Sequence, residues 1–253
     1  IKVEAEYLIA FHKAVQKPLP VSEVAVLRKL FENFTVADAM AVKKIEQQTL
    51  HDIKSIEYFM REKLKDSGIN LEFIHFGLTS DDVRYLAFNL ILQDSMQNAF
   101  KPALSRVMKK MLDLTVSYAG IPMLSRTHGQ PATPTTVGKM FANHLSRLSE
   151  ELGELNSLKL SGKLNGATGN YNALKLAYPG VDWLVFSKDF VESFGFKHLH
   201  ATTQINPHDS IIRQLHSIQR TNGIVLNFTQ DMWHYISMRY FIQRSKAGEV
   251  GSS

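Results

Sequence analysis

The sequence has no cysteine among its 253 residues, which excludes disulfide bonds and thiolate metal sites. It has no uninterrupted apolar run of the roughly 18–20 residues that a membrane-spanning helix needs, and no charged-then-apolar signal segment at its start. Phosphate-binding P-loops, HExxH zinc motifs, Rossmann fingerprints and internal repeats are missing as well. Because reducing compartments suit proteins without disulfides, we expect a cytoplasmic protein with no membrane partner.

Basic residues exceed acidic ones but do not cluster. Lysine and arginine number 29 against 24 acidic residues, which gives a net charge of +5. Such an excess suits anionic small molecules, nucleic acid or an acidic surface. No nucleic-acid partner is expected, because the basic residues are scattered, with runs no longer than Lys43-Lys44 or Lys109-Lys110, and do not alternate with aromatic ones. An anionic small-molecule ligand and a merely basic soluble protein both stay open from composition alone.

Both ends of the chain interrupt a recognisable pattern. The chain begins inside a helical pattern, IKVEAEYLIAFHKAV, without an initiator methionine, and it stops at AGEVGSS. We therefore expect a piece of a longer polypeptide. Two domains are predicted: a smaller N-terminal helical domain over residues 1–70, whose start is missing, and a central helical-bundle domain over residues 71–253, truncated in its last loop.

Helical periodicity accounts for most of the chain. Thr35, three residues before Asp38, predicts the start of a helix whose apolar positions recur at helical spacing until Gly68 ends it. A second helix is predicted over residues 80–118, with a kink or break at Pro102. Strand signals are too sparse for a sheet of any size, so we predict an all-α protein.

The longest apolar pattern lies near the C-terminal end. Asn206 as N-cap and Pro207 at the first helical position predict the start of this helix. Two neighbouring rows of the helix then form one broad stripe, Ile211, Leu215, Ile218, Asn222, Val225, Thr229, Met232 and Ile236 beside Ile212, Gln219, Leu226, Trp233 and Tyr240. A stripe this broad predicts that other long helices cover one whole side of the helix, as in a bundle.

The segment LSRTHGQPATPTT (124–136) interrupts the helices with an unusual density of hydrogen-bonding groups. His128 stands between Thr127 and a glycine, and prolines at 131 and 134 predict a rigid loop. A rigid loop with free backbone amides can position a proton donor and hold an anionic ligand. A structural histidine remains the alternative at this point.

Further candidate residues lie near the predicted start of the second helix. Thr79 and Ser80 place two hydroxyls at a helix N-terminus, which suits a carboxylate or phosphate, although ordinary capping is the simpler explanation. His51 is expected in mid-helix beside Asp52, where adjacent positions point in different directions and disfavour a dyad. His75 precedes the Thr-Ser pair and is a candidate for the same pocket.

Polar groups in two later loops complete the set of candidates. Lys163, Asn165 and Gln204 lie in loops that bracket helices and suit the binding of carboxylate or amide oxygens. His198 and His200 lack a third ligand at a recognisable spacing, so no metal site is expected.

Five loops, in this order between long helices, carry a resemblance to the fumarase/aspartase superfamily. LSRTHGQPATPTT contains the Thr-His-Gly-Gln-Pro-Ala form of the first signature, HFGLTSDD (75–82) resembles the Thr-Ser-x-Asp loop, and TTQINPHD (202–209) resembles the glutamine loop. SGKLNGATGNYNA (161–173) lies between them, and AGEVGSS (247–253) resembles the opening of the signature Gly-Ser-Ser-x-Met-Pro-x-Lys-x-Asn-Pro. The branch of the superfamily that acts on succinylated purine nucleotides matches best.

The resemblance implies an all-α homotetramer in which long central-domain helices pack into a shared bundle and three subunits build each active site. The implied reaction is a reversible β-elimination that releases fumarate from succinylated nucleotides in purine biosynthesis. It implies no metal and no organic cofactor. A net charge of +5 suits a substrate with two carboxylates and a phosphate.

The same resemblance implies roles for individual residues. Ser252, or its neighbour Ser253, is the base, and His128, positioned by Thr127, protonates the departing nitrogen. The residues implied to hold the succinyl carboxylates or the base ring are Thr79, Ser80, Gln204 and Asn165, with Lys163 as a helper and with His51 and His75 lining the nucleotide end.

Two alternatives remain at the level of sequence. Another fumarate-releasing lyase, such as an argininosuccinate lyase, is disfavoured by the Gly-Gln-Pro-Ala-Thr-Pro form and the Thr-Ser-Asp-Asp loop. A non-catalytic helical assembly protein is disfavoured because Thr127-His128, Thr79-Ser80 and Ser252 occur together. Residues 1–253 lack the Met-Pro-x-Lys-x-Asn segment and the N-terminal Arg-Tyr element expected to bind phosphate, so we expect activity from the full-length protein and none from this fragment alone.

Overall fold

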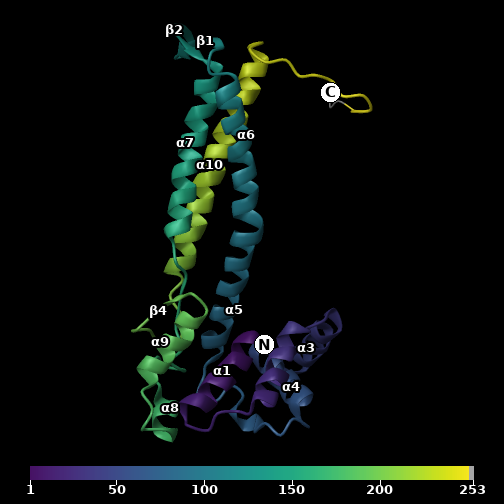
Figure 1. Ribbon diagram of the computed structural model, residues 1–253, viewed down its shortest axis with the longest axis vertical. Coiled ribbons are helices and arrows are strands. Elements are labelled where there is room, and N and C mark those ends of the chain that lie inside the picture. The colour runs from purple at the N-terminus through teal and green to yellow at the C-terminus, as the bar shows by residue number, and fades with distance from the viewer. Residues whose placement is uncertain (251–253) are drawn as a thin grey trace. The chain divides into compact units, whose positions relative to one another are not determined.

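The computed structural model describes residues 1–250 and is mainly helical (Figure 1). It forms two compact units, each described here by itself. The first unit consists of Ile1–Ser95 and Lys159–Ile211, and the second of Met96–Leu158 and the chain from Ile212 onward. These compact units are not the domains predicted from the sequence. The predicted domains, residues 1–70 and 71–253, are not tested by this division and stay a prediction.

The first unit is built from short helices and one small sheet. Its elements are α1 (Lys2–Ala14), α2 (Val21–Glu32), α3 (Val36–Thr49), α4 (Asp52–Leu64), the 3-10 turn η1 (Leu71–Phe73), α5 (Ser80–Ser95), α8 (Asn172–Ala177) and α9 (Trp183–Ser193). Strands β3 (Ser161–Gly162) and β4 (Lys197–His198) pair in parallel. The largest core cluster includes buried residues from α1, α5 and α9 and from the loop at Leu160 and Leu164, so the core anchors that loop beside the start of α5.

The predicted helix start at Thr35 is confirmed, but the single helix expected up to Gly68 is wrong. Thr35 and Asp38 form a reciprocal capping box at the start of α3. The helix then ends at Leu50, which adopts a left-handed conformation with φ of 51°, and α4 begins after His51. The imidazole of His51 accepts the backbone N–H of Lys54 and so caps the new helix. A histidine that caps a helix does not interrupt apolar periodicity, which explains why the pattern looked continuous.

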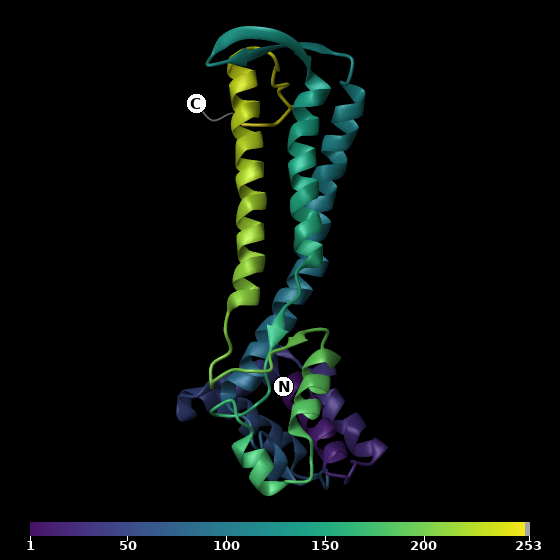
Figure 2. The same ribbon diagram turned by 90° about the vertical axis from the view of Figure 1, so that its left-hand side faces the viewer.

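The second unit contains three long helices that lie side by side (Figures 1 and 2). They are α6 (Lys101–Ser117), α7 (Val137–Ser157) and α10 (Asp209–Ser237), the last of which starts within the first unit. The predicted start of a helix at Ser80 and the predicted break near Pro102 are both confirmed, because α5 gives way to the π-helical turn η2 (Met96–Phe100) and Pro102 lies in the first turn of α6. Helix α10 begins at Asp209, slightly later than the predicted start at Pro207.

The side of α10 that packs within the chain coincides only in part with the predicted apolar stripe, since Val225 and Met232 of the stripe pack against core clusters of the second unit. Ser217 and Thr221 are buried there, and Arg220 forms an ion pair with Glu151 of α7 at 2.8 Å. In contrast, Leu226 and Trp233 of the stripe are 56% and 70% exposed. The described residues therefore leave much of the stripe uncovered.

The segment expected as a rigid loop is a β-hairpin. Strands β1 (Pro122–Thr127) and β2 (Gln130–Thr136) are antiparallel, and Thr127 pairs with Gln130 around a two-residue turn, His128-Gly129. Both turn residues have positive φ, 52° and 75°, as a type I′ hairpin turn requires. The prolines are compatible with β2 because a strand at the edge of a sheet can lack some N–H donors.

Among the described residues, no helix combines the length and the apolar character that crossing a membrane requires.

Candidate active site

The start of α5 brings together two of the expected hydroxyls and two distant residues. Ser80 Oγ lies 3.4 Å from His51 Nε2, and Gln204 Nε2 donates a hydrogen bond to Thr79 Oγ1 at 3.4 Å. Gln204 is separated from Thr79 by 125 residues in the sequence. Thr79, Ser80, His51 and Gln204, singled out separately in the sequence, therefore form one polar surface of the first unit.

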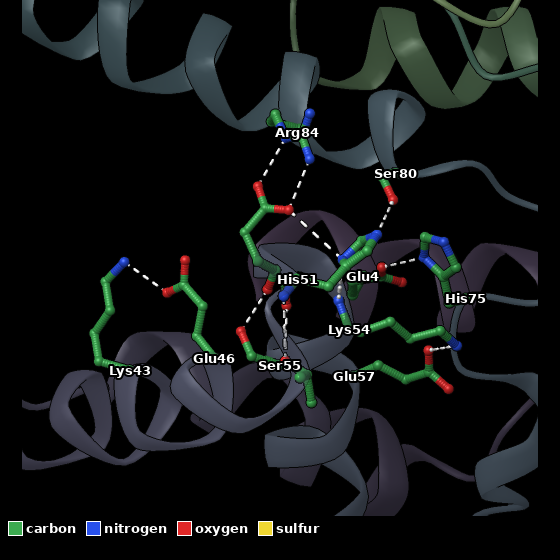
Figure 3. A network of polar contacts seen from close by, with 12 residues as sticks. Glu4, Lys43, Glu46, His51, Lys54, Ser55, Glu57, His75, Ser80 and Arg84 are labelled. Atoms are coloured by element: carbon green, nitrogen blue, oxygen red, sulfur yellow. Dashed lines mark hydrogen bonds and ion pairs between the residues drawn. The ribbon is translucent and has the colours of Figure 1, made fainter.

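His51 is held in one orientation at the N-cap of α4, not in mid-helix as expected (Figure 3). Its Nδ1 accepts the backbone N–H of Lys54 at 3.1 Å, so a neutral ring carries its proton on Nε2, which faces Ser80. Asp52 Oδ1 lies 3.7 Å from Nδ1, but Arg84 binds both oxygens of Asp52 at 2.7 and 2.8 Å. The hydrogen bond with Arg84 lowers the pKa of Asp52. His51 and Asp52 therefore have other main partners, the backbone N–H of Lys54 for His51 and the guanidinium of Arg84 for Asp52.

His75 is bound to a carboxylate that the sequence did not identify (Figure 3). Its Nδ1 lies 2.6 Å from Oε1 of Glu4, which is fully buried in α1. Burial lowers the pKa of His75, but the hydrogen bond and charge of Glu4, with the nearby charge of Glu57, outweigh it and raise the pKa above its ordinary value. His75 also has a positive φ of 62°, a strained conformation that is typical of functional sites.

This ion pair predicts a specific dependence of stability on pH. A histidine whose pKa is raised by folding stabilises the protein below its ordinary pKa of about 6.5, and the contribution is lost as pH rises through the higher folded value. Glu4→Gln should therefore lower the melting temperature of the full-length protein near and just below about pH 6.5, and it should flatten the fall in melting temperature as pH rises above that value. Glu6→Gln is the matched control, because Glu6 pairs with Arg28 and not with a histidine. Parallel pH profiles for wild type and Glu4→Gln would contradict the assignment.

Lys163 and Asn165 lie in a buried loop next to the start of α5. Lys163 is 1% exposed, and its Nζ donates to Asp82 Oδ1 at 2.6 Å and to Asn165 Oδ1 at 3.1 Å. Asn165 Nδ2 donates to Thr202 Oγ1 at 2.7 Å, which links this loop to the glutamine loop. A Cβ on Gly169 would meet the carbonyl oxygen of Thr202 at 2.1 Å, so only glycine permits this approach.

Thr127 and His128 belong to the second unit, at the tip of the β1–β2 hairpin. Both side chains are exposed, and Arg126 Nη1 donates to the carbonyl oxygen of Gly129 across the turn at 3.1 Å. The hairpin thus presents His128 at a turn with a defined backbone conformation. The expected base, Ser252, and its neighbour Ser253 lie outside the described residues.

Sequence reasoning missed Glu4 and Asp82. The place of Asp82 in Thr-Ser-Asp-Asp, which resembles the Thr-Ser-x-Asp loop, was the available signal. Glu4 has no such signal, since a charged residue in an apolar helical pattern gives no indication of its partner. Among residues 1–250, no group of three or more His, Asp or Glu side chains is placed to hold a metal ion.

Comparisons with known proteins relate both units to one family. Residues 11–253 match the family described as Lyase. The adenylosuccinate lyase of Escherichia coli (strain K12) is 40% identical over 260 residues, which cover 100% of this chain and 57% of the relative. The adenylosuccinate lyase of Haemophilus influenzae is 42% identical over 240 residues, covering 93% and 52%, and that of Dictyostelium discoideum is 41% identical over 266 residues, covering 100% and 57%. The chain thus spans about half the length of these relatives.

Solved structures support the fold. A fumarate lyase from Mesorhizobium sp. BNC1 matches with a TM-score of 0.75 at 18% identity, over 92% of this chain and 53% of that one. The β-carboxy-cis,cis-muconate cycloisomerase of Acinetobacter calcoaceticus matches with a TM-score of 0.71 at 20% identity, over 92% and 54%. These matches confirm the all-α fold of the fumarase/aspartase type. With its similarity to adenylosuccinate lyases over the whole sequence, the chain belongs to the lyase family of the fumarase/aspartase superfamily.

Proposed function

We propose that the full-length protein is an adenylosuccinate lyase, a carbon–nitrogen lyase of purine biosynthesis. It releases fumarate from adenylosuccinate to give AMP and from SAICAR to give AICAR. The observation that carries the proposal is identity of about 40% to adenylosuccinate lyases across the whole chain. The convergence of Thr79, Ser80, Asn165 and Gln204 in one unit supports it, because a substrate with two carboxylates needs several fixed donors.

In the proposed β-elimination, each catalytic residue carries out one step. Ser252 removes the proton from the carbon next to a carboxylate, the C–N bond breaks, and the electron pair goes to the departing nitrogen. His128 donates a proton to that nitrogen. Thr79, Ser80, Asn165 and Gln204 hold the carboxylates or the base ring, and Lys163 helps through the loop that it shares with Asn165.

The nucleotide end of the substrate is assigned to the two histidines of the first unit. His51 offers a fixed Nε2–H beside Ser80, and the raised pKa of His75 favours its charged form. A charged imidazole suits an anionic nucleotide. No metal or organic cofactor takes part in this assignment.

We further propose a cytoplasmic homotetramer whose active sites are shared between subunits. The exposed apolar residues of α10, which include Leu215, Leu226 and Trp233, support it. A row of large apolar side chains along a long helix is stabilised when another helix covers it. Identical chains can supply that cover by forming a common bundle. Neither nucleic acid nor a membrane is a partner in this proposal.

The assay that tests the function follows adenylosuccinate directly. We expect the full-length protein to convert adenylosuccinate to AMP, measured as the loss of ultraviolet absorbance, and the fragment 1–253 alone to be inactive. Turnover of argininosuccinate in place of adenylosuccinate would move the protein to another branch of the superfamily. Full-length protein that assembles but releases fumarate from neither substrate would support a non-catalytic assembly protein.

A further inference from the structure

Asp82 is a fully buried carboxylate that accepts four hydrogen bonds. Its Oδ1 accepts from Lys163 Nζ at 2.6 Å and from the backbone N–H of Asn165 at 3.1 Å. Its Oδ2 accepts from the backbone N–H groups of Thr79 at 2.9 Å and Gly166 at 3.0 Å. Two carboxylate oxygens provide lone pairs for all four donors, whereas an amide offers only one acceptor oxygen.

These donors belong to segments that are far apart in the sequence. Lys163 and Gly166 are separated from Asp82 by 81 and 84 residues. Asn165, whose backbone Asp82 holds, in turn contacts Thr202 through its side chain at 2.7 Å. Gln204 follows two residues later in the sequence and donates to Thr79 Oγ1. The contacts therefore run from the start of α5 through two loops and back to the start of α5.

We propose that Asp82 is a positioning residue for fumarate release, which sets the mutual spacing of Thr79, Asn165 and Gln204 without touching the substrate. This inference rests on the proposed function, because it takes those three side chains as substrate ligands. Asp82 acts on Thr79 and Asn165 through their backbone N–H groups. It acts on Gln204 indirectly, because Gln204 donates a hydrogen bond to the side chain of Thr79 and lies in the loop that Asn165 contacts at Thr202. Hydrogen bonds to an ionised acceptor are among the stronger ones in proteins, so this attachment restrains the loops.

Lys163 helps Asp82 to hold the loop that contains Asn165 in place. Its ammonium is fully buried, and its neighbours are Asp82, Asn165 Oδ1 at 3.1 Å and the carbonyl oxygen of Gly166 at 3.4 Å. Burying a carboxylate is costly unless it has a counter-charge and satisfied hydrogen bonds, and Lys163 provides that charge. The lysine thus supports the binding loop from inside the protein.

Asp82→Asn in the full-length enzyme tests the proposal. The side chain keeps its shape, but an NH₂ group replaces one acceptor oxygen and faces N–H donors. Because misplacement of ligands by about 1 Å can cost about 100-fold, we expect kcat/KM to fall about 100-fold, with a clear increase in KM. A purely structural role would reduce the folded fraction, measured by circular dichroism, and leave the KM of the folded enzyme unchanged. That second result would overturn the proposal.

Glu151→Gln is the matched control. Glu151 of α7 is also a carboxylate held by a cation, Arg220 at 2.8 Å, and by the hydroxyl of Ser217 at 3.0 Å, but neither partner belongs to the three loops. We expect a lower melting temperature with an unchanged KM. Together, the two variants separate the loss of an ion pair from the loss of loop position.

The double variant Asp82→Asn/Lys163→Met separates charge from position. It removes the unpaired buried ammonium, so the melting temperature should recover. The N–H groups of Thr79, Asn165 and Gly166 still have one amide oxygen in place of two carboxylate oxygens, so KM should stay high. A return of KM to the wild-type value would overturn the proposal, because neutralising Lys163 would then be the whole role of Asp82.

Hydrogen–deuterium exchange provides a readout that needs no substrate. The amides of residues 79, 165 and 166 should exchange faster in Asp82→Asn than in wild type or Glu151→Gln. If wild type does not convert adenylosuccinate but this exchange difference is found, the proposed function fails and the anchoring of the loops stands. If wild type is active and Asp82→Asn shows neither faster exchange nor a higher KM, the positioning role fails and the proposed function stands.

Discussion

His128→Asn should reduce turnover of adenylosuccinate by the full-length protein about 10²–10⁴-fold, the range that a positioned general acid contributes. Asparagine tolerates the left-handed conformation that His128 adopts, with φ of 52°, and Asn-Gly is a favoured pair in type I′ turns. The substitution therefore keeps the hairpin while it removes the imidazole. The measurement is kcat from the change in ultraviolet absorbance, with circular dichroism and melting temperature to show that the fold persists.

His216→Ala provides the control for this experiment. His216 is exposed on α10 and lies outside the proposed site, so its removal should leave kcat unchanged. Turnover by His128→Asn at the wild-type rate would contradict the assignment of the proton donor. A large loss with His128→Ala but none with His128→Asn would mean that the turn needs a residue tolerant of positive φ and that the imidazole is not required.

The double variant Leu226→Glu/Trp233→Glu should dissociate the proposed tetramer and abolish activity. These side chains are 56% and 70% exposed in the single chain, and burying two large apolar side chains contributes about 3–6 kcal/mol. Loss of that contribution corresponds to an increase in the dissociation constant of about 10²–10⁴-fold, before the cost of burying two charges is added. Sedimentation velocity should show smaller species, and activity should fall if the active sites are shared between subunits as proposed.

Leu176→Glu is the matched control for the interface. Leu176 lies on α8 and is 86% exposed, so a new charge there should change neither the assembly nor the activity. A tetramer that persists in Leu226→Glu/Trp233→Glu would contradict the proposed interface. Dissociation with full activity would instead contradict the sharing of active sites between subunits.

Local signals in the sequence predicted several elements correctly because their causes are local. The Thr35–Asp38 capping box involves residues three positions apart, and the break near Pro102 follows from a missing N–H and a steric clash. Such effects depend on neighbouring residues and are present in the sequence itself. The break at Leu50 was missed, since a histidine cap leaves apolar periodicity unchanged.

Periodicity alone did not predict the packing of α10. The apolar stripe identified an apolar side of the helix, but it did not show which surface covers that side. Within the chain, α10 packs through apolar residues such as Ile224 and Phe228 and through Ser217, whose hydroxyl donates a hydrogen bond to Glu151 of α7. Apolar pattern alone does not distinguish a surface that packs inside one chain from a surface that packs between chains.

By itself, the sequence determined that the protein is helical, that His128 lies in a donor-rich segment between helices, and that the motif loops resemble those of the fumarase/aspartase superfamily. Only the tertiary structure decided that His51 caps a helix, that Glu4 holds His75, and that Asp82 joins loops more than 80 residues apart in the sequence. The physical reason is that caps, turns and periodicity arise from neighbours along the chain. Contacts such as Asp82 with Lys163 depend on how the core folds the loops together, and no local pattern encodes that partner.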